Sequence, residues 1–185
     1  MNKSILSILV TSALTVTSSA VFAADEGFYL GGGLGQSRTT NSTTNVSTTG
    51  TSFKLIGGYA FNQNFAVEAE YVDLGTFAGV TGADIKGTAV GASAVGTIPL
   101  GEVFSLYGKV GVASVSTTAT AQPGWMLLVP ATQTKSGVSF GIGGAFNVSP
   151  NAAIRLSIDS YQFDALASNL TGRVATYGVA GVFKF

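Results

Sequence analysis

Apolar and polar residues alternate along most of this sequence, from about residue 28 to its end. In one such stretch Phe53, Leu55, Gly57, Tyr59 and Phe61 occupy every second position. A strand points successive side chains to opposite faces, so a period of two predicts β-strands. We predict eight strands, at residues 28–37, 51–61, 65–74, 87–99, 103–116, 137–148, 152–163 and 171–185. Each is about ten residues or longer, the length that a tilted strand needs to cross a bilayer.

The connections between these strands alternate in length. Residues 62–64, 100–102 and 149–151 form tight turns, whereas 38–50, 75–86, 117–136 and 164–170 are longer segments rich in Thr, Ser, Asn and Gly. Short turns at one end and long loops at the other are typical of outer-membrane barrels. The pattern predicts an all-β fold, an eight-stranded antiparallel transmembrane up-and-down β-barrel. Its turns and termini would lie in the periplasm and its loops outside the cell.

The two faces of the predicted strands differ in chemistry. One face of six strands is apolar, with aromatic residues toward the strand ends, as in the girdles of membrane barrels. The first and fourth strands contain too many small residues to show which face is which. The opposite face carries Gly, Ala, Ser and most strand charges, namely Lys54, Glu68, Glu70, Lys109, Arg155, Asp159 and Lys184. A soluble, lipocalin-like barrel would show the reverse arrangement, so we favour the membrane barrel.

Composition supports this interpretation. Charged residues make up 10% of the 185 residues, against about 25% in soluble domains. The nine basic and nine acidic residues balance, and histidine and cysteine are absent. These absences exclude serine–histidine hydrolase chemistry and Cys-ligated metals. The lack of basic clusters argues against nucleic acid as a partner. We therefore expect no cofactor, no metal site and no enzymatic activity.

The first residues have the features of a secretory signal. Lys3 gives a basic start, residues 5–16 are mostly apolar, and Val21, Phe22 and Ala23 precede the expected cleavage point. This pattern predicts a signal peptide at 1–23 and a barrel at 24–185. The alternative is an N-terminal membrane anchor, for which the apolar stretch is short.

Four stretches, at residues 27–31, 57–71, 106–111 and 177–185, carry a family resemblance through their order and spacing. Together they resemble the small OmpA/OmpX-type, opacity-like outer-membrane barrels, over residues 27–185 and for the barrel domain only. The resemblance implies a bacterial outer-membrane location, in contact with membrane lipid and lipopolysaccharide. It also implies that Glu68 and Arg155 form an interior ion pair that plugs the barrel. Tyr177, Phe183 and Phe185 resemble the terminal signal that the barrel-assembly machinery reads.

Counting residues from the turns leads to the same ion pair. Glu68 is the fourth residue after the turn at 62–64, and Arg155 is the fourth after the turn at 149–151. The two residues should therefore face each other across the lumen at equal depth. Lys109 would lie somewhat further from the turns, nearer Glu70 and Asp159. Unpaired charge in a narrow lumen is costly, so we predict a paired network. The alternative is that each charge contacts lumen water.

The segment 117–136 contains the single tryptophan, within an apolar run. An exposed apolar patch often marks a contact surface. Trp125, Met126, Leu127 and Leu128 are therefore candidates for contact with a host or partner molecule. Two alternatives are that the segment folds onto the outer leaflet, or that it lengthens the fifth and sixth strands above the membrane.

Three function classes follow. We favour a non-catalytic outer-membrane barrel with a structural or surface-interaction, adhesin-like role. The alternative is a narrow or gated porin-like channel for ions or small solutes, although eight strands leave little interior space. An enzyme acting on lipid A or peptides is disfavoured, because histidine is absent and no Asp/Glu pair stands out in the predicted loops.

Overall fold

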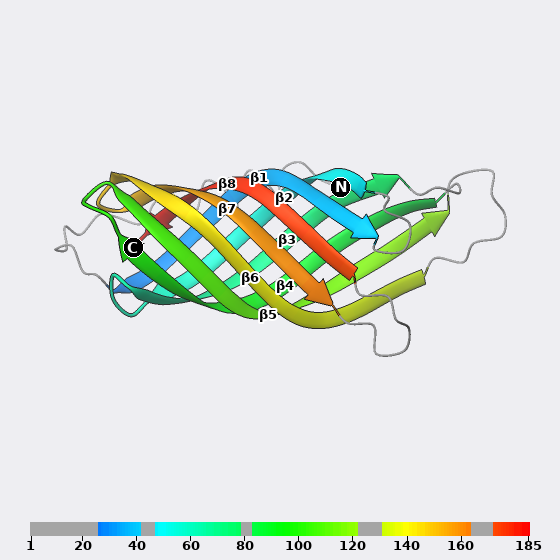
Figure 1. Ribbon diagram of the computed structural model, residues 1–185, viewed down its shortest axis with the longest axis horizontal. Helices are drawn as coiled ribbons and strands as arrows, with labels where there is room; N and C mark the ends of the chain where they lie inside the picture. Colours follow the sequence, from blue (N-terminus) through cyan, green and yellow to red (C-terminus); the bar gives the residue numbers. More distant parts are fainter. Residues whose placement is uncertain (1–25, 42–46, 79–82, 122–130, 164–171) are drawn as a thin grey trace, which may run out of the picture.

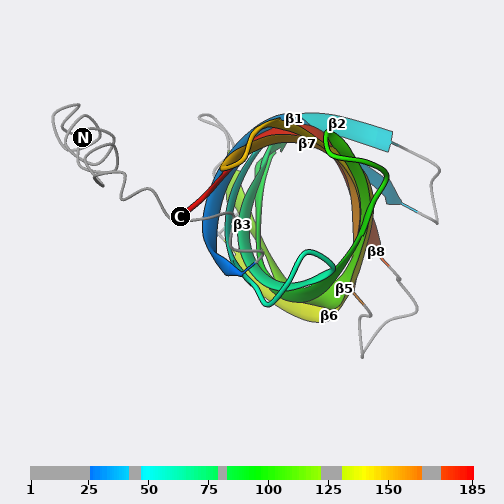
Figure 2. The ribbon, with the colours of Figure 1, turned by 90° about the vertical axis from the view of Figure 1, so that its left-hand side faces the viewer.

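The chain forms a closed eight-stranded antiparallel barrel, which confirms the predicted fold class (Figures 1 and 2). The computed structural model describes residues 26–41, 47–78, 83–121, 131–163 and 172–185, so the predicted signal peptide lies outside them. Each strand pairs with the next, and β8 closes on β1, where Leu34 is opposite Val179. The strands are β1 (Gly27–Asn41), β2 (Ser47–Ala60), β3 (Phe65–Ala78), β4 (Ala83–Pro99), β5 (Phe104–Ala121), β6 (Ala131–Ser149), β7 (Ala152–Phe163) and β8 (Gly172–Lys184). Within the described ranges, no helix is long and apolar enough to cross a membrane.

The three tight turns and the end of β8 lie at one end of the barrel, on the left in Figure 1. In the first turn the Asn62 Oδ1 accepts hydrogen bonds from the backbone N–H groups of Asn64, at 2.8 Å, and Phe65, at 2.9 Å. Asn side chains favour such turns because they can take over backbone hydrogen bonds locally. We call this end the turn end and the opposite end the loop end.

At the loop end the strands are longer than the sequence predicted. β5 continues to Ala121 rather than residue 116, β6 starts at Ala131 rather than 137, and β2 starts at Ser47 rather than 51. β3 likewise continues to Ala78 and β4 starts at Ala83, so the predicted boundaries of 38–50, 75–86 and 117–136 as loops were wrong. The residues concerned are rich in threonine, a β-branched residue that suits strands. Of the alternatives for 117–136, extension of the two strands is the one that the described residues show.

Side-chain hydroxyls join β5 and β6 near the loop end. The hydroxyl oxygens are 2.6 Å apart in Ser114–Ser136, 2.9 Å in Ser116–Thr134 and 3.2 Å in Thr118–Thr132. Such cross-strand hydrogen bonds stabilise sheets. We call these three pairs the hydroxyl ladder.

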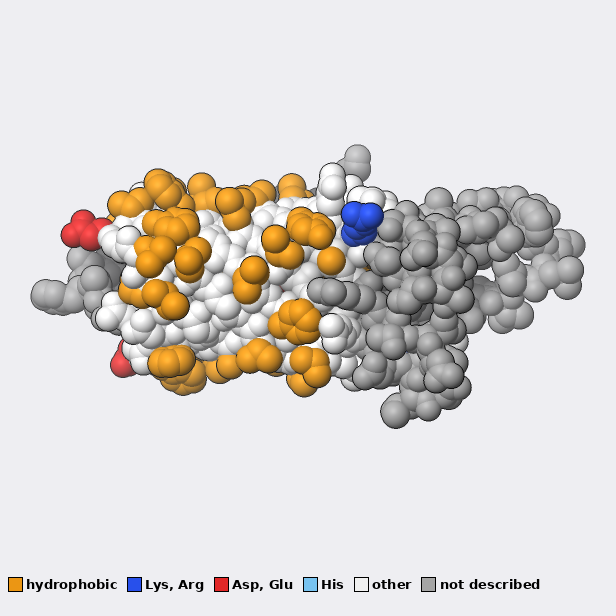
Figure 3. Space-filling model, viewed as in Figure 1, with side chains coloured by type: hydrophobic (Ala, Val, Ile, Leu, Met, Phe, Trp, Pro, Cys, Tyr) orange, Lys and Arg blue, Asp and Glu red, His pale blue; other side chains and the backbone are white. Residues whose placement is uncertain are grey.

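The outer wall of the barrel is apolar. Phe28, Leu30 and Leu34 in β1 and Val90 and Ile98 in β4 are exposed, which settles the outward face of the two strands that the sequence left open. On the face seen in Figure 3, hydrophobic side chains cover the wall and charged side chains lie only toward its two ends.

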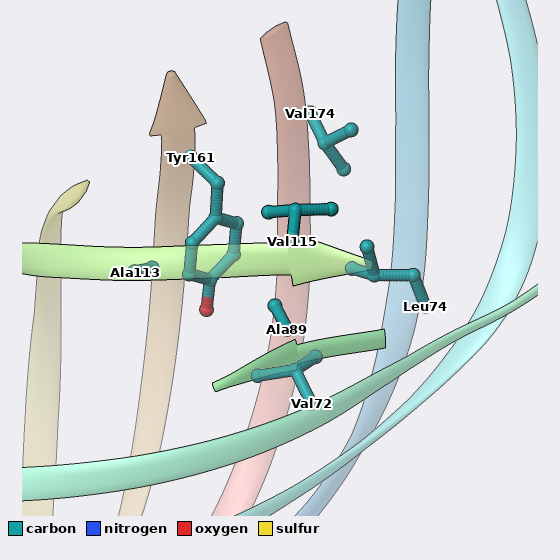
Figure 4. Packing of buried hydrophobic residues seen from close by; sticks show 7 residues of the cluster. All are labelled: Val72, Leu74, Ala89, Ala113, Val115, Tyr161 and Val174. Carbon is teal, nitrogen blue, oxygen red and sulfur yellow. The ribbon is translucent and has the colours of Figure 1, made fainter. Parts of the chain in front are cut away.

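The lumen contains three layers. A cluster of apolar side chains fills the loop end: Val72, Leu74, Ala89, Ala113, Val115, Tyr161 and Val174 (Figure 4). Two smaller clusters lie toward the turn end: Tyr29, Ile56, Ala180 and Val182, and Val95, Tyr107 and Ala145. Charged side chains occupy a middle layer between the large cluster and the turns. The smaller clusters reach into this layer, since the register places Ile56 beside Glu70 and Val95 beside Lys109. The large apolar residues are a finding, because the sequence analysis described the inner face only by its small and charged residues.

Candidate functional site

Six charged side chains meet in the middle layer of the lumen. They come from four strands: Lys54 from β2, Glu68 and Glu70 from β3, Lys109 from β5, and Arg155 and Asp159 from β7. All six occupy inward positions of the period-two pattern. Three positive and three negative charges balance, so the site carries no formal net charge.

Four of these residues form a cluster on the loop side of the middle layer. The Lys109 Nζ lies 2.6 Å from the Glu70 Oε2 and 3.0 Å from the Asp159 Oδ1. The Lys54 Nζ pairs with Asp159 and lies 3.8 Å from the Glu70 Oε2. The Tyr161 hydroxyl donates a 3.0 Å hydrogen bond to the Glu70 Oε1. Two lysines thus share two carboxylates, and a tyrosine supports one of them.

Arg155 and Glu68 form a second cluster, nearer the turns. The Arg155 Nη1 donates a hydrogen bond to the Glu68 Oε1, and the Tyr29 hydroxyl donates to the same oxygen at 2.8 Å. The guanidinium carbon lies 5.1 Å from the ring centre of Tyr29 and 5.2 Å from that of Tyr107. Aromatic faces attract cations at this range. The guanidinium is therefore held by one carboxylate and two aromatic rings.

The three carboxylates and Lys109 are almost completely shielded from solvent, whereas the side chains of Lys54 and Arg155 are 12% and 17% exposed. The side chains of Glu68, Glu70 and Asp159 are each 2% exposed, and that of Lys109 is 5% exposed. Removing charges from water costs several kcal/mol per ion, and good pairing geometry has to offset this cost. Each buried carboxylate in this site has at least one cationic partner, which meets that requirement.

A glycine on β6 makes room for the loop-side cluster. The backbone of Gly141 passes close to the two ionised groups, and a Cβ atom there would overlap the Asp159 carboxylate. The same atom would lie 2.8 Å from the Lys109 Cε. Any larger residue at this position would displace the ion pairs.

The structure brings the predicted network residues together. It places Glu68 against Arg155, and Lys109 against both Glu70 and Asp159. The sequence analysis placed Lys54 on the inner face but did not assign it to the network. Lys54 lies six residues before Ala60, the last residue of β2, and Glu70 lies five residues after Phe65, the first of β3. Counting back from the turn would therefore have placed Lys54 near the depth of Glu70.

The sequence analysis missed the three tyrosines of the site. Tyr29 lies in the strand whose faces were undecided, and Tyr107 and Tyr161 occupy inward positions that were not examined. Their positions on the inward face of the strands could have identified them. A buried tyrosine hydroxyl needs a hydrogen-bond partner, and the charged residues of the lumen offer one.

The lumen is hollow between the network and the turn end. A cavity of about 750 Å³ is lined by residues of the three turns and by Tyr29, Tyr107, Arg155 and Lys184. Among the residues that the structure describes, no group of three or more His, Cys, Asp or Glu side chains could hold a metal ion.

The predicted assembly residues lie on the outer wall. Tyr177 is 46% exposed, Phe183 50% and Phe185 51%, and the rings of Phe183 and Phe185 meet edge to face at 5.3 Å. The predicted contact residues Trp125, Met126, Leu127 and Leu128 lie outside the described residues.

Sequence comparison finds one domain family over nearly the whole chain. The sequence model of the outer membrane protein beta-barrel domain matches residues 7–183. An uncharacterized protein of Haemophilus influenzae is 26% identical over 178 residues, which are 93% of this chain and 96% of that protein.

Solved barrels share the fold at low sequence identity. Neisserial surface protein A matches with a TM-score of 0.73 at 18% identity, over 86% of this chain and 97% of that one. Ail of Yersinia pestis, solved in complex with the heparin analogue sucrose octasulfate, matches with a TM-score of 0.64 at 20% identity, over 87% and 99%. OprG of Pseudomonas aeruginosa matches with a TM-score of 0.60 at 17% identity, over 89% and 99%.

Proposed function

We propose that this chain, which belongs to the outer membrane protein beta-barrel domain family, is a non-catalytic barrel whose lumen is plugged. The chain lies in the bacterial outer membrane, where its apolar wall contacts lipid. We assign it a structural and surface-interaction role.

The observation that carries the plug is the buried ion-pair network. It links β2, β3, β5 and β7 across the lumen, and the apolar cluster of the loop end lies beyond it. An ion that moved through the lumen would have to break pairs that are shielded from solvent. Low dielectric surroundings strengthen such pairs, so the network opposes steady conduction.

Planar-bilayer recording tests the plug. The wild-type protein should show no steady conductance, and Glu68→Ala, which removes the carboxylate partner of Arg155, should open a stable one. The control is Glu102→Ala, because Glu102 is an exposed carboxylate in the turn between β4 and β5. A conductance that is the same in wild type and Glu68→Ala would contradict the plug.

The cavity favours a second function, a gated channel. It extends from the turns to Arg155, so the lumen is already hollow over part of its length. A gated channel would show brief voltage-dependent openings in the wild-type protein, and Glu68→Ala would lengthen them. A plug predicts no openings before the substitution.

The surface role rests on the extension of β5 and β6, whose hydroxyl ladder is polar and uncharged. Residues 122–130 connect these two strands, and Trp125, Met126, Leu127 and Leu128 are the proposed contact with a host or surface ligand. The double variant Trp125→Ser, Leu127→Ser should lose binding to host cells. Thr48→Ser, in β2, is the control. If the double variant binds as well as the wild-type protein, this segment is not the contact surface.

We also propose that the barrel-assembly machinery reads Tyr177, Phe183 and Phe185. Support comes from the exposure of Tyr177 and Phe183 on β8, the strand that closes the barrel against β1, and of Phe185, the residue that follows it. Phe185→Ala should lower the amount of protein assembled in the outer membrane. Phe28→Ala is the matched control, because Phe28 is an exposed aromatic residue on the neighbouring strand. An equal loss in both variants would reduce the role of Phe185 to packing in the aromatic girdle.

A further inference from the structure

A furrow crosses the outer wall over β4 to β8. It consists of two adjoining cavities, of about 630 and 720 Å³, which share Gly96, Gly108, Ile142 and Ile158. Because the shared residues join the two cavities, we treat them as one groove and call it the wall furrow.

Two neighbouring glycines form the floor of the wall furrow. The cross-strand register places Phe65 beside Gly96, Gly96 beside Gly108, and Gly108 beside Ile142. A Cβ atom on Gly96 would meet no atom within 4 Å, and one on Gly108 would meet only the backbone oxygen of Gly141, at 3.9 Å. Strands lie about 4.8 Å apart, so Phe65 and Ile142 flank a gap of about 14 Å.

Apolar side chains surround this gap. In the neighbouring register rows, Val110 and Phe140 stand on the loop side and Ile98 and Leu106 on the turn side. All four are exposed on the outer wall. The wall furrow therefore has an apolar rim. Lys109 is the charged residue of its lining, and its ammonium group lies in the lumen, paired with Glu70 and Asp159.

The two glycines lie in the half of the wall nearer the turns. Gly96 is three residues before the end of β4, and Gly108 is four residues after the start of β5. These spacings correspond to about 10 to 14 Å along a strand. The short turns of outer-membrane barrels face the periplasm, so this part of the furrow lies in the periplasmic leaflet, which consists of phospholipid.

We propose that the wall furrow binds an acyl chain of a phospholipid. The outer-membrane location of the chain puts hydrocarbon against this wall. An unfilled groove forfeits dispersion contacts along its whole lining, and a flexible acyl chain can follow a floor of glycines between apolar rims. A second copy of this barrel suits the furrow less well, because a two-fold contact centred on the furrow would set one furrow against another.

Photolabelling in vesicles tests the proposal. The full chain is reconstituted into phosphatidylethanolamine and phosphatidylglycerol vesicles that contain a phosphatidylethanolamine with a diazirine in its acyl chain. After irradiation, mass spectrometry maps the labelled residues. Label should concentrate on residues 94–98, 106–110 and 140–144. Labelling spread evenly around the apolar wall would overturn the proposal.

A second test uses a variant in which a larger side chain fills the furrow. Gly96→Leu should lose the excess label, so that these segments fall to the level of the rest of the wall. Gly181→Leu is the matched control, since Gly181 is an outward glycine whose Cβ would also meet nothing within 4 Å but lines neither cavity. Heat-modifiable gel migration verifies folding, and Gly108→Leu replaces Gly96→Leu if that variant does not fold. Undiminished label in a folded Gly96→Leu or Gly108→Leu variant would overturn the proposal. So would furrow label that falls as the protein density in the vesicles rises, because a second barrel would then be covering the furrow.

Discussion

The lumen and the outer wall are built from the same strands, yet they are specified in different ways. On β5, Lys109 points inward and 8% of the whole residue is exposed, whereas its neighbour Val110 points outward and 60% of the whole residue is exposed. Lys109 needs the Glu70 and Asp159 carboxylates within 3.0 Å. Val110 needs only an apolar medium, and any apolar residue of similar shape meets that need. The inner face is thus fixed by individual partners and the outer face by residue class.

This difference predicts unequal responses to substitution. A change in the lumen leaves a particular buried group without its partner, so its cost depends on the contact that is lost. A change on the wall costs little while the residue stays apolar, and much when it becomes charged. Four substitutions test this contrast.

The largest effect is expected for Glu70→Ala. This change leaves Lys54 and Lys109 with Asp159 as their remaining carboxylate, and it removes the acceptor of the Tyr161 hydroxyl. Breaking a buried pair by removing one partner costs about 3 to 5 kcal/mol. Urea unfolding of the barrel refolded into vesicles should show a loss of this size. Glu102→Ala, at an exposed position, should change the free energy of unfolding by less than about 0.5 kcal/mol. A similar small change for Glu70→Ala would mean that lumen water solvates the charges separately.

The next effect concerns a charge placed on the wall. Val179 lies on the outer face of β8 and is 47% exposed. A lysine facing the bilayer midplane costs about 2 to 4 kcal/mol in membrane barrels. Val179→Lys should therefore destabilise the barrel in vesicles by about this amount, while Val179→Leu keeps the residue class and should cost less than about 1.5 kcal/mol. If both variants unfold at the wild-type urea concentration, the wall around Val179 does not face hydrocarbon.

The eight strands, and the faces of six of them, were predictable because both follow from a period of two. The depth match of Glu68 and Arg155 was predictable because the two residues are the same number of positions from a tight turn. The loop boundaries were not predictable, because serine and threonine occur both in loops and in strands, where their hydroxyl groups can pair across the sheet. Ser116 and Thr134, 2.9 Å apart, show the second case.

The individual contacts of the network could also not be predicted from the sequence. Lys54 reaches Asp159 from the other side of the lumen, on strands that do not pair with each other. Tyr29 was hidden in a strand whose glycines gave no alternation. Contacts across the lumen depend on how the barrel closes, and the residue pattern along a single strand does not predict that closure.

A smaller effect is expected for Tyr161→Phe, which sharpens the comparison within the lumen. The phenylalanine ring keeps the packing with the loop-end cluster but removes the hydrogen bond to the Glu70 carboxylate. Hydrogen bonds to charged groups contribute about 1.5 to 3 kcal/mol. Urea unfolding in vesicles should show a loss within that range and below that of Glu70→Ala. A loss equal to that of Glu70→Ala would mean that the tyrosine, rather than the lysines, accounts for the cost of removing Glu70.

The smallest effect is expected in the hydroxyl ladder, which faces outward like the wall but is paired like the lumen. Thr134→Val preserves the β-branched shape and removes one partner of the Ser116 hydroxyl. Cross-strand pairs of this kind contribute about 0.2 to 1 kcal/mol. Because both side chains are at least partly exposed, water replaces the lost partner, and urea unfolding should shift by no more than this amount. A loss above about 2 kcal/mol would show that the ladder is desolvated in the membrane, since a buried hydroxyl left without a partner costs about 1 to 3 kcal/mol. The ladder would then follow the rule of the lumen, and partner identity rather than facing direction would decide which positions of the barrel tolerate substitution.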